Sequence, residues 1–559
     1  MTSSANDDEI VDILCIGAGF GGLYVSYRAT RAGFTVAGFE RAEAVGGTWY
    51  WNRYPGARCD IESIYYSYSF SEELQQEWEW SERFATQPEI LHYLDHVAVR
   101  FDLRRHFTFG TSVVAATWLE DERLWQVELD SGEIRRGRHL VSAVGCLSTA
   151  KTPDVPGIER FTGTTVSTSN WDLPMQELAG KRVAVIGTGS SGVQCIPLIA
   201  EVAQELTVFQ RTPNYVMPAR NAPLDQEFVA RIKTDYAAVR EECRRSTRGF
   251  PDRPTTQRAF DVAEEERRRR YEAAYLVSGF TSVGDEFVDL LTDLDANETA
   301  ARFLRDKVRE VVNDPGKAAL LEPRYHPFGA KRTCFGTDYY ETFNRSNVEL
   351  VSLRHEPIVD MTARSIRTGS REVEIDVLVL ATGFDAVTGS LLKLGITTST
   401  GRSLATEWAS GPRTYLGLTT AGFPNFYMIG GPQSPGVLSN FVVSIEQHVD
   451  WVTELLVHIR ERGVDRVDVD PGAQDDWVDL VDKVVGETLY ATTESWYRGA
   501  NIPGKPASFL AYAGGVGNYR EICDEVATHG YRGLRLTPAD EDPSPTGTAP
   551  TRTRTGAAR

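Results

Sequence analysis

Short runs of consecutive apolar residues recur along the chain, and each one ends in glycine. They occupy residues 10–16, 140–145, 183–186 and 376–383. Such runs, without polar alternation, are typical of strands buried on both faces of a parallel sheet. The pattern therefore predicts an α/β protein built around parallel strands.

In other segments the apolar and polar residues are spaced differently. Residues 111–118 and 125–129 alternate apolar and polar positions, which predicts two antiparallel strands. Residues 65–102 are mostly helical in pattern, and Gln87-Pro88 predicts a helix start. Residues 221–324 carry charged helical periodicity, and we expect a helical insertion that closes over the active site. Its run 264–270 reads either as a basic docking patch or as a solvated helix, and we favour the solvated helix because glutamates directly precede the arginines.

The first apolar run enters the turn Gly17-Ala18-Gly19-Phe20-Gly21-Gly22. Gly17 permits the tight turn, Gly19 lets the backbone approach a pyrophosphate, and Gly22 lets the following helix pack on the strand. The next strand ends in Glu40, at the spacing where a carboxylate accepts hydrogen bonds from a ribose. This turn predicts a dinucleotide site, which we assign to FAD.

A second turn, Gly187-Thr188-Gly189-Ser190-Ser191-Gly192, follows the run at 183–186. The strand after it ends in Gln210-Arg211-Thr212, without the acid found in the first unit. Arginine and threonine can hold a 2′-phosphate that a carboxylate would repel. We therefore expect NADPH here, with cofactor contacts from Gly187, Gly189, Ser190, Ser191, Gly192, Gln194, Arg211 and Thr212.

Length and composition narrow the possible domain number, partners and protein class. A chain of 559 residues implies two or three domains. A formal net charge of -19 disfavours nucleic acid and anionic membranes as partners. Without a long apolar run or a signal-like N-terminus, we expect a cytoplasmic protein, either a monomer or a weak homo-oligomer. The seven cysteines show no metal-ligand or C-x-x-C spacing, which weighs against a metal site and against flavin disulfide reductases.

Residues 161–172 carry the most specific pattern. They read Phe161-Thr162-Gly163, then Ser167, then Trp171-Asp172. This segment resembles the F-x-G-x-x-x-H-x-x-x-W-[PD] fingerprint of Baeyer–Villiger monooxygenases, with Ser167 in place of the histidine. Segments 46–60 and 328–348 resemble the phenylacetone and steroid monooxygenase type within that family.

The resemblance implies roles for named residues. Arg332 is the catalytic arginine, Asp60 lies beside the flavin and pairs with it, and Lys331 contacts the nicotinamide cofactor. The loop around Trp496 folds over NADP. The flavin-contacting stretch includes Gly47, Thr48 and Trp49, and the loop bordering flavin and substrate includes Pro435, Val437, Leu438 and Phe441.

The implied reaction uses FAD and NADPH to insert one oxygen atom from O2 next to a ketone carbonyl. It passes through a peroxyflavin and a tetrahedral adduct and gives an ester or lactone. Two alternatives stay open, namely a heteroatom (N- or S-) monooxygenase and an NADPH oxidase or redox-binding protein.

The expected organisation has two Rossmann-like domains. Residues 1–148 and 376–537 form the FAD domain, residues 149–220 and 325–375 the NADPH domain, and residues 538–559 a disordered tail. The resemblance implies that Ser167 lies on the linker between the domains. We expect it to keep a structural hydrogen bond there, whereas an indispensable imidazole at this position would shift the chain toward another activity.

Overall fold

The computed structural model describes residues 10–151, 153–251, 255–279 and 283–540. Its first sheet has eight strands in the order β17-β4-β5-β6-β1-β2-β3, with β18 also pairing with β6. β1 is parallel to β2 and β6, as its continuous apolar run predicted. β4 and β5 are antiparallel to each other, as their alternating apolar and polar residues predicted. The strands span β1 (Ile10–Ile16), β2 (Val36–Phe39), β3 (Phe107–Thr108), β4 (Val113–Leu119), β5 (Leu124–Leu129), β6 (Ile134–Ser142), β17 (Ile396–Thr398) and β18 (Phe426–Met428).

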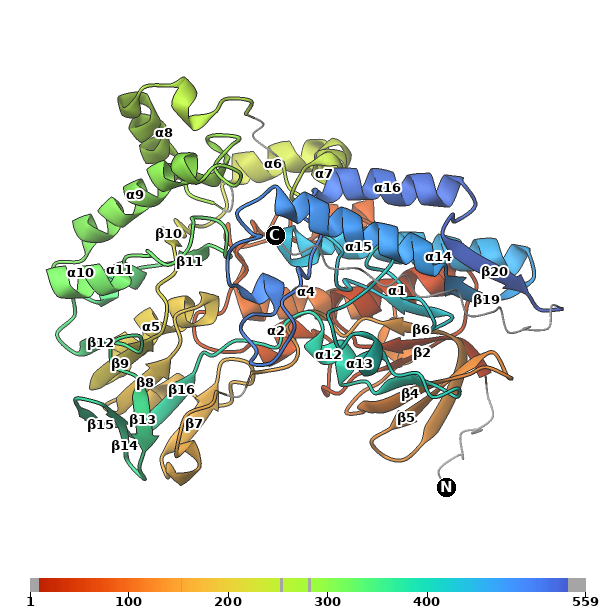
Figure 1. Ribbon diagram of the computed structural model, residues 1–559, viewed down its shortest axis with the longest axis horizontal. Helices are drawn as coiled ribbons and strands as arrows, with labels where there is room; N and C mark the ends of the chain where they lie inside the picture. Colours follow the sequence, from red (N-terminus) through yellow and green to blue (C-terminus); the bar gives the residue numbers. More distant parts are fainter. Residues whose placement is uncertain (1–9, 152, 252–254, 280–282, 541–559) are drawn as a thin grey trace, which may run out of the picture.

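The second sheet is parallel throughout and has the order β12-β9-β8-β16-β7. Figure 1 shows it on the opposite side of the molecule from the first sheet. Its strands are β7 (Thr164–Ser167), β8 (Arg182–Ile186), β9 (Glu205–Gln210), β12 (Val348–Ser352) and β16 (Val377–Leu380). The two sheets give the predicted pair of Rossmann-like units.

One expected boundary is wrong. We placed residues 376–380 in the first domain, but β16 lies between β8 and β7 in the second sheet, where Val377 pairs with Val183 and Thr164. A buried apolar run looks the same in either sheet, so the pattern could not distinguish them. The chain returns to the first sheet only after this strand.

Helices follow both glycine turns and build the insertion. α1 (Phe20–Arg31) and α5 (Ser190–Val202) begin directly after Gly19 and Gly189. The insertion contains α6 (Gln226–Thr234), α7 (Tyr236–Arg245), α8 (Glu264–Val277), α9 (Leu294–Val311) and α10 (Pro315–Leu321), and α8 to α10 lie above the second sheet in Figure 1. Glu266 on α8 pairs with Arg269 and Arg270, so the charged run is a helix with internal ion pairs, as expected.

Side-chain caps and proline start several other helices. α4 (Gln87–Arg100) has proline in its first turn, and Asp470 caps α15 (Pro471–Gly486) by accepting from Gly472 N and Ala473 N. The remaining helices are α2 (Thr48–Trp51), α3 (Glu72–Glu77), α11 (Tyr339–Thr342), α12 (Gly389–Leu392), α13 (Leu404–Glu407), α14 (Phe441–Glu461) and α16 (Val516–Thr528).

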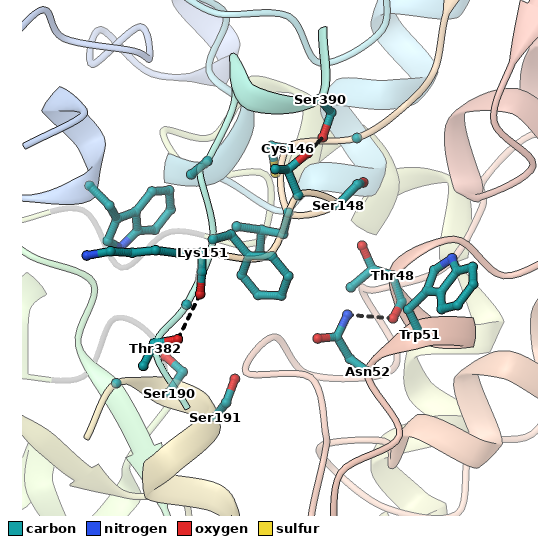
Figure 2. A pocket seen from close by; sticks show the side chains of 18 of the residues that line it. Thr48, Trp51, Asn52, Cys146, Ser148, Lys151, Ser190, Ser191, Thr382 and Ser390 are labelled. Atoms are coloured by element: carbon teal, nitrogen blue, oxygen red, sulfur yellow. Dashed lines mark hydrogen bonds between the residues drawn. The ribbon is translucent and has the colours of Figure 1, made fainter. Parts of the chain in front are cut away.

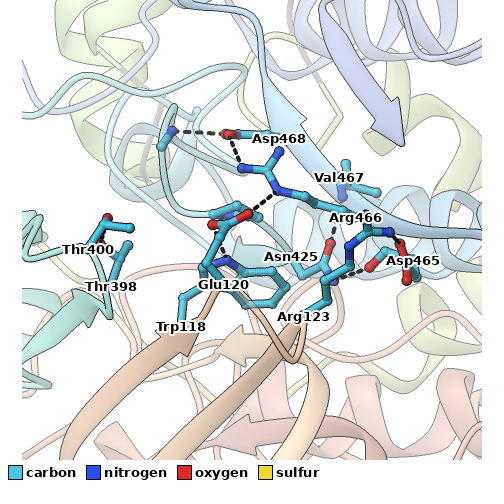
Figure 3. Close-up of polar contacts among 12 residues, drawn as sticks. Trp118, Glu120, Arg123, Thr398, Thr400, Asn425, Asp465, Arg466, Val467 and Asp468 are labelled. Carbon is cyan, nitrogen blue, oxygen red and sulfur yellow. Dashed lines mark hydrogen bonds and ion pairs between the residues drawn. The ribbon is translucent and has the colours of Figure 1, made fainter. Parts of the chain in front are cut away.

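Small sheets complete the fold. β10 (Val216–Pro218) pairs with β11 (Cys334–Gly336), and β13 (Ile358–Met361), β14 (Ser365–Thr368) and β15 (Glu372–Glu374) form a meander. β19 (Val464–Val469) pairs with β20 (Leu534–Pro538), so Pro538, the first residue of the expected tail, lies in a strand instead. The tail residues 541–559 lie outside the described part. Arg123 anchors this hairpin to the first sheet through Asp465 at 2.5 Å (Figure 3).

Candidate active site

A cavity of about 1130 Å³ lies between the ends of the two sheets, and residues of both glycine turns line it. In Figure 2, Thr48 and Asn52 face Ser190, Ser191 and Thr382 across this space. The expected residues that line it are Gly17, Gly19, Glu40, Gly47, Thr48, Trp49, Asp60, Gly187, Gly189, Ser190, Ser191, Gln194, Arg211, Thr212, Lys331, Arg332, Val437, Phe441 and Trp496. Gly22, Gly192, Pro435 and Leu438 are not among the residues that line it, although Leu438 lines a smaller pocket together with Lys331 and Arg332.

The two glycine turns have the same construction. Gly17 and Gly187 adopt φ values of +105° and +113°, and a Cβ on them would lie 2.6 and 2.3 Å from the carbonyl oxygens of Ala143 and Ala381. A Cβ on Gly22 would lie 1.7 Å from Gly17 O. Only glycine fits these positions, so each helix packs closely on its own strand.

The middle glycines leave room for a ligand. A Cβ on Gly189 would meet no heavy atom within 4 Å, and a Cβ on Gly19 would meet only Gly47, with Cα at 3.4 Å. Both residues precede a helix whose first turn contains no acidic side chain. The amides of these helix starts therefore suit a pyrophosphate, and the two turns fit the two dinucleotides.

Glu40 is held at the end of β2. Its side chain accepts hydrogen bonds from Ala18 N at 2.7 Å and Ala42 N at 2.8 Å, and the residue is 5% exposed. Each carboxylate oxygen keeps a further lone pair for a ribose hydroxyl. The carboxylate is therefore fixed beside the first glycine turn, as expected for an adenosine-binding acid.

Arg332 and Asp60 form a bidentate ion pair. Arg332 Nε donates to Asp60 Oδ2 at 2.8 Å, and Nη2 donates to Oδ1 at 2.7 Å. Arg332 Nη1 donates to Val437 O at 2.8 Å, which places the expected substrate loop against the guanidinium. Burial lowers the pKa of Arg332, but the attraction of Asp60 outweighs it, and the net pKa lies above the usual value. The guanidinium is therefore a permanent positive charge at the cavity wall.

A second group of cations gathers near the end of β9. Burial lowers the pKa of Lys331, and the nearby Arg211 and Arg354 lower it further. Arg354 Nη2 donates to Thr212 Oγ1 at 3.2 Å, and its guanidinium lies 4.1 Å from the centre of the Tyr325 ring. Such a concentration of positive charge suits a phosphate group.

Sequence reasoning missed Arg354, which follows β12 and reaches the site only because β12 pairs with β9. It also missed Tyr54, whose hydroxyl donates to Gln194 Oε1 at 2.8 Å, while Gln194 Nε2 donates to Arg58 O at 3.1 Å. These bonds join the start of α5 to the flavin-contacting stretch. Contacts between such distant segments leave no local signal in the sequence.

Ser167 ends β7 and lies outside the lining of the cavity. Its hydroxyl lies 2.8 Å from Ser169 Oγ and donates to Leu380 O at 3.5 Å. The serine thus keeps a bond to a neighbouring backbone group, next to the strand end that leads into Ala381. Within the described residues, no group of histidine, cysteine and acidic side chains is arranged to hold a metal. None of the described helices is both long and apolar enough to cross a membrane.

The comparisons with known proteins agree with this site. The family model for pyridine nucleotide-disulphide oxidoreductases matches residues 11–277. All seven cysteines are buried, and none of them lies in a C-x-x-C pattern. A Baeyer–Villiger monooxygenase of Pseudooceanicola batsensis is 40% identical over 94% of this chain and 96% of its own length.

Two further relatives cover nearly the whole chain. The phenazine N-monooxygenase PhzNO1 of Lysobacter antibioticus is 38% identical over 96% of this chain and 99% of its own length. The structure of an oxidized steroid monooxygenase bound to NADP is 50% identical, with a TM-score of 0.90, and the match covers 95% of this chain and 100% of that one. The chain belongs to the Baeyer–Villiger monooxygenases, the flavoprotein family that uses FAD and NADPH to insert an oxygen atom next to a ketone carbonyl.

Proposed function

We propose that Arg332 and Asp60 are the catalytic pair of this monooxygenase. Attack on a ketone carbonyl places negative charge on the carbonyl oxygen, and a fixed positive charge stabilises that oxyanion most where water is excluded. The bidentate pairing and the 19% side-chain exposure of both residues support this role. Asp60 then orients the guanidinium, and the hydrogen bond to Val437 O ties it to the substrate loop.

We assign the first glycine turn and Glu40 to FAD, and the second turn to NADPH. FAD supplies the oxygen-activating chemistry when bound, and the protein supplies binding and orientation. Arg211, Thr212 and Lys331, joined by Arg354, would hold the 2′-phosphate by charge-assisted hydrogen bonds. The mutual effect of these cations on the pKa of Lys331 supports the assignment, because an anion there would offset their repulsion.

The proposed substrate is a ketone with a large apolar body, either arylaliphatic or cyclic and including steroids. Val437, whose carbonyl oxygen accepts from Arg332, and Phe441 both line the cavity, and apolar side chains there favour an apolar substrate. The similarity to the steroid monooxygenase named above supports the bulkiest of these ketones, the steroids, as substrates. Oxidation of an aromatic nitrogen is the second candidate, because PhzNO1 is a phenazine N-monooxygenase.

We also propose a cytoplasmic location, supported by buried cysteines that form no disulfide, namely Cys15, Cys59, Cys146, Cys195, Cys334 and Cys523. A monomer or weak homo-oligomer is the proposed state, and sedimentation velocity over a range of protein concentrations tests it.

Substitution of Arg332 tests the catalytic assignment. Arg332→Ala should lower ester formation about 100- to 1000-fold, because it removes a fixed donor to the developing oxyanion. The variant should still bind FAD and oxidise some NADPH, releasing peroxide. Arg402→Ala, which removes an arginine paired with Glu407 on the surface, is the matched control. Ester formation by Arg332→Ala at near wild-type rate would exclude Arg332 from the mechanism.

A further inference from the structure

The two chain segments that cross between the sheets pair with each other. Residues 149–151 lead from the first sheet to the second, and residues 383–385 lead back. Lys151 N donates to Gly383 O and Asp385 N donates to Thr149 O, both at 2.9 Å. Thr382 Oγ1 donates to Lys151 O at 3.0 Å, as Figure 2 shows. We call this pair of segments the crossing ladder. Because both segments connect the two domains, a rotation of one domain against the other must change the position of the ladder.

The segment Ser495–Lys505 docks on the crossing ladder. We call it the strap, and its Trp496 lines the cavity. Lys151 Nζ donates to Asn501 O at 2.6 Å, and Asn501 Nδ2 donates to Phe384 O at 2.8 Å. These two bonds fix the middle of the strap to both strands of the ladder.

An ion pair fixes the end of the strap. Lys505 Nζ lies 2.5 Å from Asp385 Oδ1, and it also donates to Ala386 O at 3.3 Å. The side chains of Lys505 and Asp385 are 13% and 27% exposed. Neither Lys505 nor Asp385 is among the residues that line the cavity, whereas Trp496 and Asn501 of the strap are.

We propose that Lys505 and Asp385 are positioning residues that latch the strap to the crossing ladder and so hold Trp496 over the NADP site. The proposal rests on the position proposed above for NADPH. When the ladder shifts with the domains, the latch carries that movement to the strap, so that coenzyme retention follows domain arrangement. Removing one partner leaves a half-buried charge without a counterion, which favours release of the strap.

Hydrogen exchange measured on the FAD-bound enzyme tests the latch. With saturating NADP+, the amides of residues 495–505 should exchange faster in Lys505→Met and Asp385→Asn than in wild type. NADP+ should dissociate about tenfold faster, which corresponds to about 1.4 kcal/mol. The charge-reversed double variant Lys505→Asp/Asp385→Lys should restore part of both properties.

The chain offers a matched control in the anchor of the C-terminal hairpin. Arg123 and Asp465 also lie 2.5 Å apart (Figure 3), with side-chain exposures of 11% and 30%. Neither residue is among those that line the cavity. Asp465→Asn should leave strap exchange and NADP+ release unchanged.

Two outcomes would overturn the proposal, and a third would contradict only the proposed function. Wild-type exchange and NADP+ release in Lys505→Met would show that the pair does not position the strap. Equal changes in Asp465→Asn would show a general loss of stability instead. A wild-type enzyme whose strap protection responds to NADP+ but which forms no ester would contradict the proposed function and leave the latch intact.

Discussion

At the scale of single residues, we attribute coenzyme choice to a few side chains at the end of β9. Thr212 accepts from Arg354, and Lys331 lies within the electrostatic reach of Arg211 and Arg354. The first dinucleotide site has Glu40 at the end of β2, where the second has Gln210, which is followed by Arg211. The two sites share the same glycine turn before a helix. They differ in the charge of the side chain expected at the ribose, which is negative at Glu40 and positive at Arg211.

Arg211→Ala tests this difference. Losing a charge-assisted contact to the 2′-phosphate should weaken NADPH use by about ten- to a hundredfold, equivalent to about 1.5 to 3 kcal/mol, while NADH use stays the same. The measurement is kcat/KM with each coenzyme. An equal loss with both coenzymes would show that Arg211 does not read the phosphate.

At the scale of elements, the sequence predicted the strands and helices that surround the cavity. The apolar runs, the glycine turns and the start of α4 are local signals, and the structure confirms each of them. Sheet membership was harder to predict, since β16 looks like any buried strand until its neighbours are known. The close approach of helix and strand at each turn explains why glycine is required there.

Gly22→Ala should disrupt the first turn. Its Cβ would lie 1.7 Å from Gly17 O, so α1 must move away from β1, and such overpacking costs about 1 to 3 kcal/mol. We expect a lower flavin content after purification and a lower thermal midpoint. Gly486→Ala, at the end of α15, meets no atom within 4 Å and should retain flavin at the wild-type level. Full flavin occupancy in Gly22→Ala would contradict the packing argument.

At the scale of the whole molecule, the site exists only where the two units meet. The Arg332–Asp60 pair joins residues 272 positions apart, and Lys505–Asp385 joins residues 120 positions apart. The first pair was expected only because of the family resemblance, and the second was not expected at all. Spacing and periodicity report local structure, so contacts between distant segments leave little trace in a single sequence.

Ser167 also lies where the two units meet. It ends the edge strand β7 of the second sheet, and it lies beside the segment that crosses back to the first sheet. We expect the wild-type enzyme to oxygenate ketones with some loss of reducing equivalents to peroxide. Ser167→His should alter the ester yield per NADPH consumed without creating the activity. If the wild type forms no ester and Ser167→His does, serine at this position has removed the ketone chemistry.

The most direct test of the central claim follows the oxygen atom. Purified FAD-bound enzyme is incubated with NADPH, ¹⁸O2 and a panel of arylaliphatic, cyclic and steroid ketones, and ester and peroxide are quantified together. We expect an ester or lactone containing one ¹⁸O atom from at least one ketone, and loss of that product in Arg332→Ala. Peroxide as the sole oxygen product with every ketone, while NADPH is consumed, would contradict this expectation.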